Sequence, residues 1–419
     1  MSILGIRFRA FLEIGLAATL VLSLAQRSSA QTMPGMSDMS GMSMMHHKAA
    51  APCESTQPLG CADTATAAFA PDGTLLLTWT QDQKVYFARS KDRGESWTLP
   101  LRIADITAGF DGGGDARPQI AADATGRVLV AYDTFKDQHW NAEIWLARSS
   151  DGGVHFGAPS VFEPGGVSQR LPVLDLEPSG KILMAWQDKR LSGPQQLPGA
   201  SIAYAWSTDG GGTFSTSAIA ADSSCECCRI GVTNAGDAAP ILAFRTIFPG
   251  EVRDHVILRF LPSGLPDKPR RISVDDWVTN SCPHQGPSIA VSGSGTIHTV
   301  WYTQGKARQG LFYARSTDGG LSFGDPQRLG DPDSMASRPF VLAHGDAVWR
   351  VWKEFDGHAS HVLMQLSRND GRDWSATSVI DSSMGSSDHP LLIGYLNHVF
   401  LSWLNSEHGY QLIELKDPR

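Results

Sequence analysis

The sequence predicts an all-β fold, a β-propeller of seven repeat units, and two recurring signatures carry this prediction. The first is an apolar strand that closes on an aromatic residue, with seven copies spaced 51–58 residues apart. The second is the octapeptide Ser-x-Asp-x-Gly-x-x-Phe/Trp, which follows most of these strands. Repeat units of about 50 residues with three or four short strands each are typical of propeller blades. The aromatic markers are Trp79, Tyr132, Trp186, Phe244, Trp301, Trp352 and Trp403.

The residue types of the octapeptide fit a tight turn between two strands. The aspartate accepts hydrogen bonds from its own turn, the glycine supplies a positive φ angle, and the aromatic residue packs beneath. We therefore expect these aspartates to stabilise turns and to take no part in catalysis. The copies are SKDRGESW (90–97), SSDGGVHF (149–156), STDGGGTF (207–214), STDGGLSF (316–323) and SRNDGRDW (367–374), the last with asparagine at the aspartate position.

The blade count depends on the irregular units of the series. The unit around Phe244 lacks the octapeptide and has LRFLPSGLPD (258–267) in its place. The last unit ends at Leu415 after three expected strands, whereas four antiparallel strands are expected in the other blades. If the two terminal units shared one blade, the count would fall to six, so a six-bladed ring is the alternative.

These octapeptides are Asp-boxes, and through them residues 53–415 resemble the Asp-box (BNR-repeat) sialidase-like propeller superfamily. The resemblance implies the fold, but function does not follow from it. The chain also resembles a group of exported bacterial Asp-box proteins with Cys-x-Cys-Cys on one repeat and Cys-Pro-x-x-Gly-Pro on the next. Here these motifs are residues 225–228 and 282–287. This second resemblance implies a recurrent pairing of cysteines across repeats and adds no catalytic residue.

Residues 1–30 are expected to be a secretory signal peptide. Arg7 and Arg9 precede an apolar run over 11–25, and Ser28-Ser29-Ala30 offers a cleavage site between small residues. The apolar run is too short for a good membrane span. We therefore expect a periplasmic or secreted protein without a membrane span after cleavage, with one propeller domain over 53–419. The net charge of −8, without any basic run, argues against a nucleic-acid partner.

Residues 31–52 are expected to form a flexible arm that binds a soft metal. The arm has glycine, serine and proline but no leucine, isoleucine, valine or aromatic residue, so it cannot form a core helix. Thioethers and imidazoles favour Cu(I) among the abundant metals. The expected ligands are Met33, Met36, Met39, Met42, Met44, Met45, His46 and His47.

The remaining chemistry-bearing residues fall where innermost strands are expected to begin. Counting back from the markers places two soft-ligand groups on neighbouring blades, with Cys225, Cys227 and Cys228 on one and Cys282 with His284 on the next. Thiolates and imidazole match Cu(I), or zinc in a four-ligand site. In an oxidising compartment six cysteines are by default three disulfides, Cys53–Cys61 among them. Disulfides alone, a metal site, or one disulfide with a metal site remain open.

The same count places four arginines around the axis as candidate anion-binding residues. Arginine binds carboxylates through two parallel hydrogen bonds, and the sialidase-like resemblance implies an arginine triad, a tyrosine nucleophile paired with glutamate, and an aspartate acid/base. The superfamily's Phe-Arg-Ile-Pro motif is absent, and Tyr395 is the one conceivable nucleophile. Alternatively, the arginines form ion pairs with carboxylates such as Asp115, Asp333 and Asp388. The four arginines are Arg117, Arg170, Arg229 and Arg338.

The leading hypothesis from the sequence is therefore an exported copper-binding propeller that serves buffering, delivery or tolerance. Its partners would be a metal ion, Cu(I) with zinc or none as alternatives, and a periplasmic copper-handling protein. This hypothesis favours a protein that is not an enzyme. The first alternative is an exo-acting glycosidase of the sialidase class, and the second is a scaffold for protein interactions.

Overall fold

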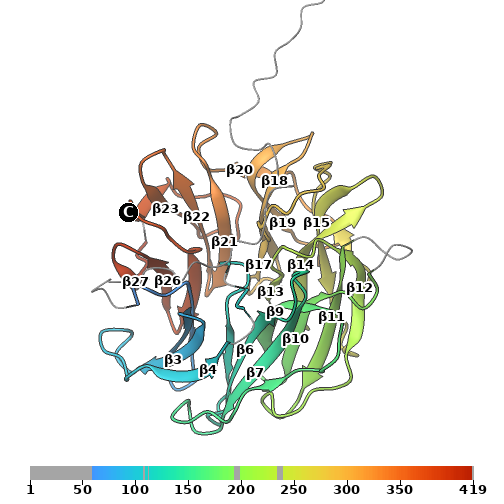
Figure 1. Ribbon diagram of the computed structural model, residues 1–419. Helices are drawn as coiled ribbons and strands as arrows, with labels where there is room; N and C mark the ends of the chain where they lie inside the picture. Colours follow the sequence, from blue (N-terminus) through green and yellow to red (C-terminus); the bar gives the residue numbers. More distant parts are fainter. Residues whose placement is uncertain (1–58, 107–108, 112, 193–198, 234–238, 418–419) are drawn as a thin grey trace, which may run out of the picture. The chain divides into compact units, whose positions relative to one another are not determined.

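The computed structural model describes residues 59–417, except 107–108, 112, 193–198 and 234–238. The described residues form seven antiparallel sheets, each made of consecutive strands, and these sheets are the blades of a propeller (Figure 1). Six blades have four strands, and in the described part of the chain the seventh has three. The predicted seven-bladed fold is thus confirmed, and the six-bladed alternative is wrong because the first and last units form separate sheets.

The strands follow one another from the axis outward in every blade. Blades 1 and 2 comprise β1 (Thr64–Phe69), β2 (Leu75–Gln81), β3 (Lys84–Ser90), β4 (Leu101–Asp105), β5 (Gln119–Ala122), β6 (Val128–Phe135), β7 (Ala142–Ser149) and β8 (Ser160–Val161). Blades 3 and 4 comprise β9 (Gln169–Leu176), β10 (Ile182–Asp188), β11 (Ala200–Ser207), β12 (Ala218–Ser224), β13 (Gly231–Thr233), β14 (Ile241–Phe248), β15 (Val252–Arg259) and β16 (Arg270–Arg271). Blades 5, 6 and 7 comprise β17 (Ser288–Val291), β18 (Ile297–Gln304), β19 (Gln309–Ser316), β20 (Gln327–Leu329), β21 (Ser337–His344), β22 (Ala347–Phe355), β23 (Ser360–Ser367), β24 (Ser378–Ser383), β25 (Leu391–Tyr395), β26 (His398–Asn405) and β27 (Gly409–Glu414).

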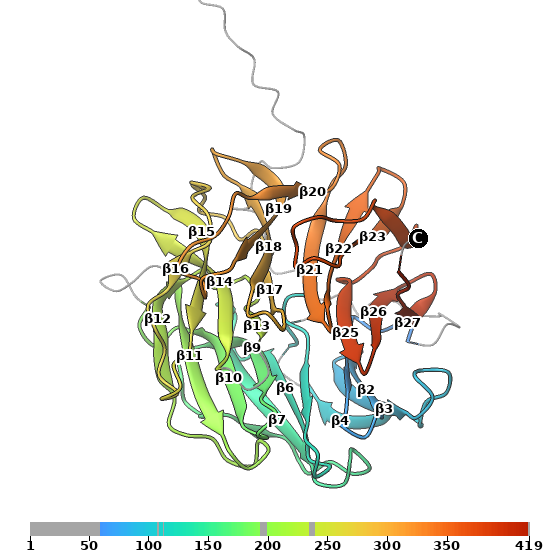
Figure 2. The ribbon, with the colours of Figure 1, turned by 180° about the vertical axis from the view of Figure 1, so that it is seen from behind.

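The first strand of each blade lies at the axis, and these seven strands contact one another in a closed ring. The ring closes where β25 and β26 of the last blade meet β1 of the first blade. Figures 1 and 2 show these two blades side by side, although they are the opposite ends of the described chain. The segments that lead into the first strands therefore converge on one end of the axis.

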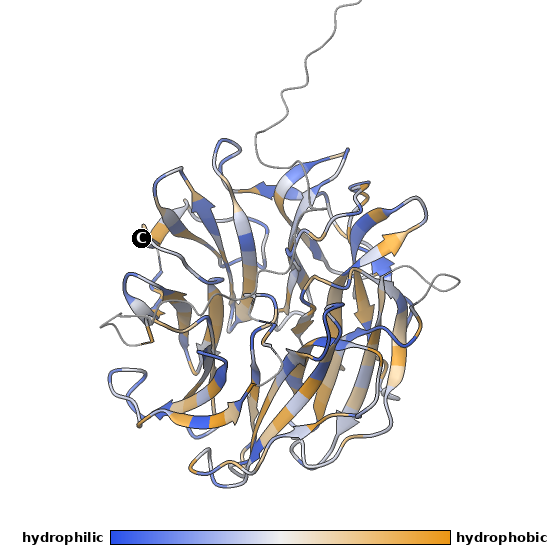
Figure 3. Ribbon diagram, viewed as in Figure 1, coloured by the Kyte–Doolittle hydropathy of each residue, from blue (hydrophilic) through white to orange (hydrophobic). Residues whose placement is uncertain are grey.

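The aromatic markers hold the core of every blade. All seven lie on the second strands and are at most 2% exposed. Each packs with aliphatic residues of its own sheet or of the adjacent one, as Phe244 does with Leu183 and Ile202 across the interface between blades 3 and 4. The apolar segments accordingly lie along the strands, and many of the loops are hydrophilic (Figure 3). This core orients the second strands, which carry several residues of the site described below.

The five octapeptides form turns of one design between the third and fourth strands of blades 1, 2, 3, 5 and 6. In blade 5 the Ser316 hydroxyl donates to Asp318 at 2.7 Å and accepts the Gly320 N–H at 2.8 Å. The same carboxylate accepts the backbone N–H of Ser322 at 3.0 Å. Bonds from the Ser322 and Ser316 side chains and from the backbone lower the pKa of the exposed Asp318. These contacts fit a structural role and leave no proton for acid catalysis.

In blades 2, 3, 4 and 6 the side chain of the residue that directly follows the marker connects its blade to the next one. The Asp133 carboxylate accepts the Leu171 N–H at 3.0 Å, and the Gln187 side chain donates to the Cys228 carbonyl at 3.2 Å. The equivalent side chains of blades 4 and 6 reach the segments before β17 and β25 in the same way: Arg245 donates to the Gln285 carbonyl at 3.0 Å, and Lys353 to the Ser387 carbonyl at 2.8 Å. Polar side chains at this one register position therefore fix the segments that surround the axis.

Candidate functional site

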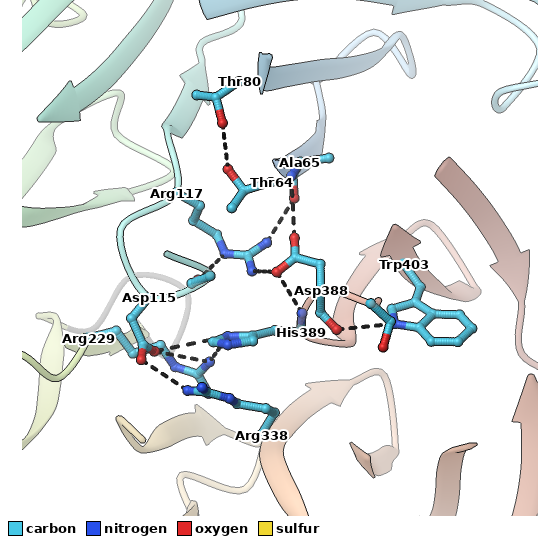
Figure 4. Close-up of polar contacts among 12 residues, drawn as sticks. Thr64, Ala65, Thr80, Asp115, Arg117, Arg229, Arg338, Asp388, His389 and Trp403 are labelled. Atoms are coloured by element: carbon cyan, nitrogen blue, oxygen red, sulfur yellow. Dashed lines mark hydrogen bonds and ion pairs between the residues drawn. The ribbon is translucent and has the colours of Figure 1, made fainter. Parts of the chain in front are cut away.

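Three of the four predicted arginines meet around the axis with His389 (Figure 4). Arg117 precedes β5, Arg229 precedes β13, and Arg338 lies at the start of β21. Their convergence follows from the equivalent positions of the three inner strands in the ring. Because so many cations lie close together, the partners of each guanidinium determine whether it can bind a ligand.

Arg117 is fully committed to its neighbours. Its Nη2 lies 2.6 Å from Asp388 Oδ1, its Nη1 donates to the Ala65 carbonyl at 2.8 Å, and its Nε donates to the Gly114 carbonyl at 2.9 Å. The side chains of both Arg117 and Asp388 are almost completely buried. Arg117 therefore ties blade 2 to blades 1 and 7, and each of its three side-chain nitrogens already has a partner within the protein.

Arg229 is held by the two blades on the far side of the ring. Its Nη1 lies 2.8 Å from His389 Nδ1, and its Nη2 donates to the Pro339 carbonyl at 3.0 Å. Arginine can only donate, so Nδ1 accepts and the neutral His389 ring carries its proton on Nε2. Burial, together with Arg229 and the other nearby cations, keeps the pKa of His389 well below its usual value. Burial likewise lowers the pKa of Arg229 to about 10.

Asp115 lies between Arg229 and Arg338. Its Oδ2 is 3.0 Å from Arg338 Nη1, and its Oδ1 is 3.9 Å from Arg229 Nη1. Burial raises the pKa of Asp115, and the arginines oppose this rise. The arginine cluster thus contains two carboxylates of the protein itself, Asp115 and Asp388. Asp333, the third carboxylate considered from the sequence, instead bonds locally through its backbone N–H to Asp331.

Arg170 belongs to a different ion pair. Its Nε donates to Asp111 Oδ2 at 2.8 Å, and the guanidinium lies over the Phe135 ring, 5.2 Å from the centroid. Asp133 is buried close by, and one of its oxygens has no hydrogen-bond partner among the described residues. Burial, with the nearby Asp111 charge, raises the pKa of Asp133 to about 8.

A polar cavity of about 300 Å³ opens between blades 1, 6 and 7 beside this cluster. Arg338 and Lys353 give it two cations, and Asp63 stands at its rim. Burial lowers the pKa of Lys353 to about 8, and the nearby Asp388 limits the change. Partial burial and the charge of Asp82 raise the pKa of Asp63. The other lining residues are Gly60, Ala62, Gly114, Ser386, Ser387, Asp388, His389, Leu404, Asn405 and Ser406.

Three cysteines form a second, separate cluster in the segment between β12 and β13. The Sγ atom of Cys225 lies 3.6 Å from that of Cys227 and 3.7 Å from that of Cys228, and all three sulfur atoms are within 4.8 Å of one another. Their exposed fractions are 0%, 3% and 1%. Cys282, on the neighbouring blade, is an exposed free thiol that interacts with Cys227. The structure therefore brings together the four cysteines that the sequence predicted as neighbours.

The four clustered cysteines are free thiols, whereas Cys61 is in a disulfide. Its predicted partner Cys53 lies outside the described residues. His284, predicted as a fifth ligand, does not join the thiol group. It is exposed, its carbonyl accepts a hydrogen bond from Arg338, and its ring acts on the charge of Asp115. His284 therefore belongs to the arginine cluster and not to the cysteines.

Two cations beside the thiols were missed from the sequence. Arg253 Nη1 donates to Cys225 Sγ at 3.5 Å, and the completely buried Arg245 also acts electrostatically on this sulfur. The hydrogen bonds of the neighbouring thiols, with these two arginines, lower the pKa of Cys225. Arg245 directly follows the marker Phe244, and a charged residue inside an apolar strand is the signal that could have identified it. Lys353 follows Trp352 in the same way.

Several residues with predicted roles lie outside the described part of the chain or away from the arginine cluster and its cavity. The signal peptide over 1–30 and the metal-binding arm over 31–52, with its methionines and histidines, are among the residues that the structure does not describe. Tyr395, the conceivable nucleophile, stacks on Phe69 with ring centroids 4.8 Å apart at the far end of β25, and it does not line the cavity. Nowhere in the described residues does a helix combine the length and apolarity that a membrane span requires.

The comparisons with known proteins support the fold. No family model and no curated protein matches the sequence. Among solved structures, an ulvan lyase bound to a GlcA(1-4)Rha3S unit is similar with a TM-score of 0.56 at 10% identity, covering 83% of this chain and 91% of the other. The polysaccharide lyase Uly1 has a TM-score of 0.51 at 10% identity, with 82% and 88% covered. An intramolecular trans-sialidase from Ruminococcus gnavus, in complex with oseltamivir carboxylate, matches at 0.42 and 13% identity, with 84% and 93% covered. The structural neighbours are thus sialidase-like and polysaccharide lyase propellers.

Proposed function

We propose that the protein is a glycan-processing propeller that takes the terminal, carboxylated sugar of a glycan into the axial cavity. The observation that carries the proposal is the pairing of Arg338 and Lys353 on the wall of a polar cavity at the end of the propeller axis. Two cations in a small, partly enclosed space favour an anionic ligand, because charge-assisted hydrogen bonds are stronger away from bulk water.

The dimensions of the cavity support an exo-acting mode. Its volume of about 300 Å³ is at the lower end of the range for small-molecule sites. Such a space accommodates one terminal residue of a chain better than several consecutive sugars. Ser386, Asn405 and Ser406 add the hydroxyl and amide groups that hydrogen-bond sugar hydroxyls.

The titratable residues of the cavity suggest roles in cleaving the bond to that sugar. Asp63, whose pKa is raised, would protonate the leaving oxygen as general acid, and its carboxylate would then take a proton from the water that adds to the sugar carbon. The Asp388 carboxylate in the same cavity would stabilise the positive charge that develops on the sugar ring. Arg338 would bind the substrate carboxylate with Lys353 beside it. This proposal departs from a sialidase triad, because Arg117 and Arg229 are committed to partners within the protein.

The fold neighbours support a glycan over copper as the ligand of the axial site. Three solved structures with TM-scores above 0.5 are polysaccharide lyases, and one of them was solved with a sugar unit that contains a uronate. This likeness bears on the fold alone, so the choice of an acidic sugar depends on the charges of the cavity. The copper hypothesis is argued separately below for the cysteines, which lie outside this cavity.

The test is a panel of fluorogenic glycosides of glucuronate, sialate and glucose, with a uronate polymer assayed for unsaturated ends. We expect turnover of an acidic glycoside and none of the neutral one. The change Arg338→Ala should lower kcat/KM at least about 100-fold, whereas Arg372→Ala, on the exposed Asp-box turn of blade 6, should not. Elimination from the polymer without hydrolysis would contradict the assigned acid catalysis. The absence of both turnover and binding of acidic sugars would contradict the function.

A further inference from the structure

We infer that Cys225, Cys227 and Cys228 form a three-thiolate site for one soft, closed-shell metal ion, and that copper(I) is the ion they fit best. The site is independent of the axial cavity and does not depend on the function proposed above. Its argument starts from the spacing of the sulfur atoms and then considers charge and access.

The spacing of the sulfurs matches ligands around a metal and not a disulfide. Two of the Sγ–Sγ distances are 3.6 and 3.7 Å, and the third is below 4.8 Å. A disulfide requires about 2.05 Å between the two sulfurs. Thiolates at about 2.3 Å from a common metal are separated by roughly 3.7–4.0 Å, which follows from tetrahedral or trigonal angles. All three sulfurs can therefore contact one ion with small side-chain movements.

The charges around the cluster indicate that it carries negative charge. Arg245 is completely buried and lies over the Trp277 ring, 4.3 Å from its centroid, and none of the ion pairs found among the described residues involves it. Its Nη1 has no hydrogen-bond partner in the described chain, while Nη2 is bound to two backbone carbonyls. A buried cation needs a compensating anion, and Arg245 lies close enough to the Cys225 sulfur to act on it electrostatically. Arg253 adds a second cation on the same sulfur.

The charges of the cluster and its surroundings nearly balance when the bound ion is copper(I). Three thiols that bind Cu⁺ release three protons and give a complex of net charge −2. Arg245 and Arg253 place two positive charges beside it, and Glu251, 3.2 Å from Arg253, offsets part of the second. Without the metal, three thiolates would crowd three negative charges into one buried space, so the cation pair and the ion stabilise the cluster jointly. Buried thiolates are also protected from oxidants, which suits an exported protein.

The position of the fourth cysteine favours copper(I) over zinc. Cys282 is exposed, and of the three buried thiols it hydrogen-bonds only Cys227. Structural zinc sites almost always have four ligands in a tetrahedron, whereas three buried thiolates complete a three-coordinate site, which suits copper(I). Thiolates are good ligands for both Cu(I) and zinc, so the choice between them depends on the number of buried ligands. In this arrangement Cys282 is the ligand that meets an incoming ion at the surface and passes it to the buried set.

The experiment uses the full exported chain, purified with its thiols reduced, and titrates it with copper(I) or zinc in competition with a chelator. Native mass spectrometry counts the bound ions, and alkylation followed by peptide mapping counts the protected thiols. We expect one copper(I) ion that protects the three buried cysteines, with at least 100-fold weaker binding in Cys225→Ser. Arg253→Gln, which keeps every thiol, should weaken copper binding about tenfold and so tests the charge argument if a cysteine variant fails to fold.

The methionines and histidines of residues 31–52 are present in every variant. Copper bound by this arm is therefore the same in each protein and cancels when a variant is compared with the unchanged chain. Two results would overturn the inference. The first is a protein from the oxidising compartment in which these cysteines are joined as disulfides. The second is copper(I) that leaves all three buried thiols reactive. Zinc that binds in preference to copper(I), with Cys282 as fourth ligand, would overturn the choice of metal.

Discussion

Asp115 Oδ2 lies 3.0 Å from Arg338 Nη1, so a carboxylate of the protein already occupies the place that a ligand carboxylate would take on this arginine. The same aspartate lies 3.9 Å from Arg229 and links cations of blades 4 and 6. Any anion that binds through Arg338 therefore competes with an internal partner. This competition lowers the affinity of the cavity for anions and keeps the arginines in place when no ligand is bound.

The change Asp115→Asn should strengthen anion binding. Asparagine preserves the shape of the side chain but removes the competing charge, so we expect the Kd for glucuronate to fall about tenfold, equal to about 1.4 kcal/mol. Calorimetric titration measures this change, and the exposed Asp325→Asn is the charge-matched control. An unchanged Kd for Asp115→Asn would show that the ligand does not use Arg338.

The one Asp-box with asparagine has a compensating partner. In the other four boxes a side chain four residues later donates to the aspartate, as Ser322 does in blade 5. In blade 6 that position holds Asp373, and Asn369 Nδ2 donates to it at 2.8 Å. We expect Asn369→Asp to place two carboxylates together and to cost about 1 kcal/mol of unfolding free energy. Adding Asp373→Ser should restore stability in urea unfolding, and additive losses in the double variant would contradict this explanation.

Asp133 should make stability depend on pH. Its folded-state pKa is raised to about 8, so between pH 4 and 8 the folded state binds more protons than the unfolded state. Stability conferred by this group should therefore fall as pH rises through that window, by at most about 1.4 kcal/mol per pH unit. The charge of Asp111 raises the pKa of this carboxyl and that of Arg170 lowers it, so the two together set the upper limit of the window. In Asp133→Asn, urea unfolding at several pH values should lose this component, and a slope equal to that of the unchanged protein would refute the assignment.

Metal binding at the cysteines should reduce the mobility of residues 282–288, the segment that leads into β17 beside the arginine cluster. Arg245, beside Cys225, donates to the Gln285 carbonyl at 3.0 Å, and Gln285 Oε1 accepts the Arg338 N–H at 3.2 Å. We expect copper(I) to slow amide hydrogen exchange in residues 282–288 at least several-fold, measured by mass spectrometry. The equivalent segment before β25, residues 386–390, lacks cysteine and is the internal control. Equal protection of both segments would indicate a general effect on stability.

The sequence predicted the ring positions well because they depend on repeat register. Counting back from the aromatic markers was sufficient to bring Arg117, Arg229 and Arg338 together, and it placed Cys282 beside the other cysteines. A repeat that recurs every 51–58 residues fixes which positions are equivalent around a ring, whatever residues fill them.

The partners of these residues could not be predicted in the same way. Asp115 was one of several nearby carboxylates, and only the path of its loop decides that it bonds Arg338 whereas Asp333 does not. The role of Arg245 could not be predicted, because the sequence does not show that the side chain after a marker points toward the next blade. His284 was placed with the cysteines by the same count back from Trp301, but its backbone has a positive φ angle of 48°, a local conformation that register cannot reveal.

The junction between blades 1 and 7 decides how the ring closes and how it stays closed. No strand of the described residues crosses from one chain end to the other blade, so the ring closes through side chains. Asp388 accepts the Ala65 N–H at 3.4 Å and pairs with Arg117, a residue 271 positions away. The entropy lost on joining such distant segments grows only with the logarithm of their separation. The other neighbouring blades are also joined by the continuous chain, whereas blades 1 and 7 meet only through noncovalent contacts of the described residues. The ring should therefore open first at this junction under load.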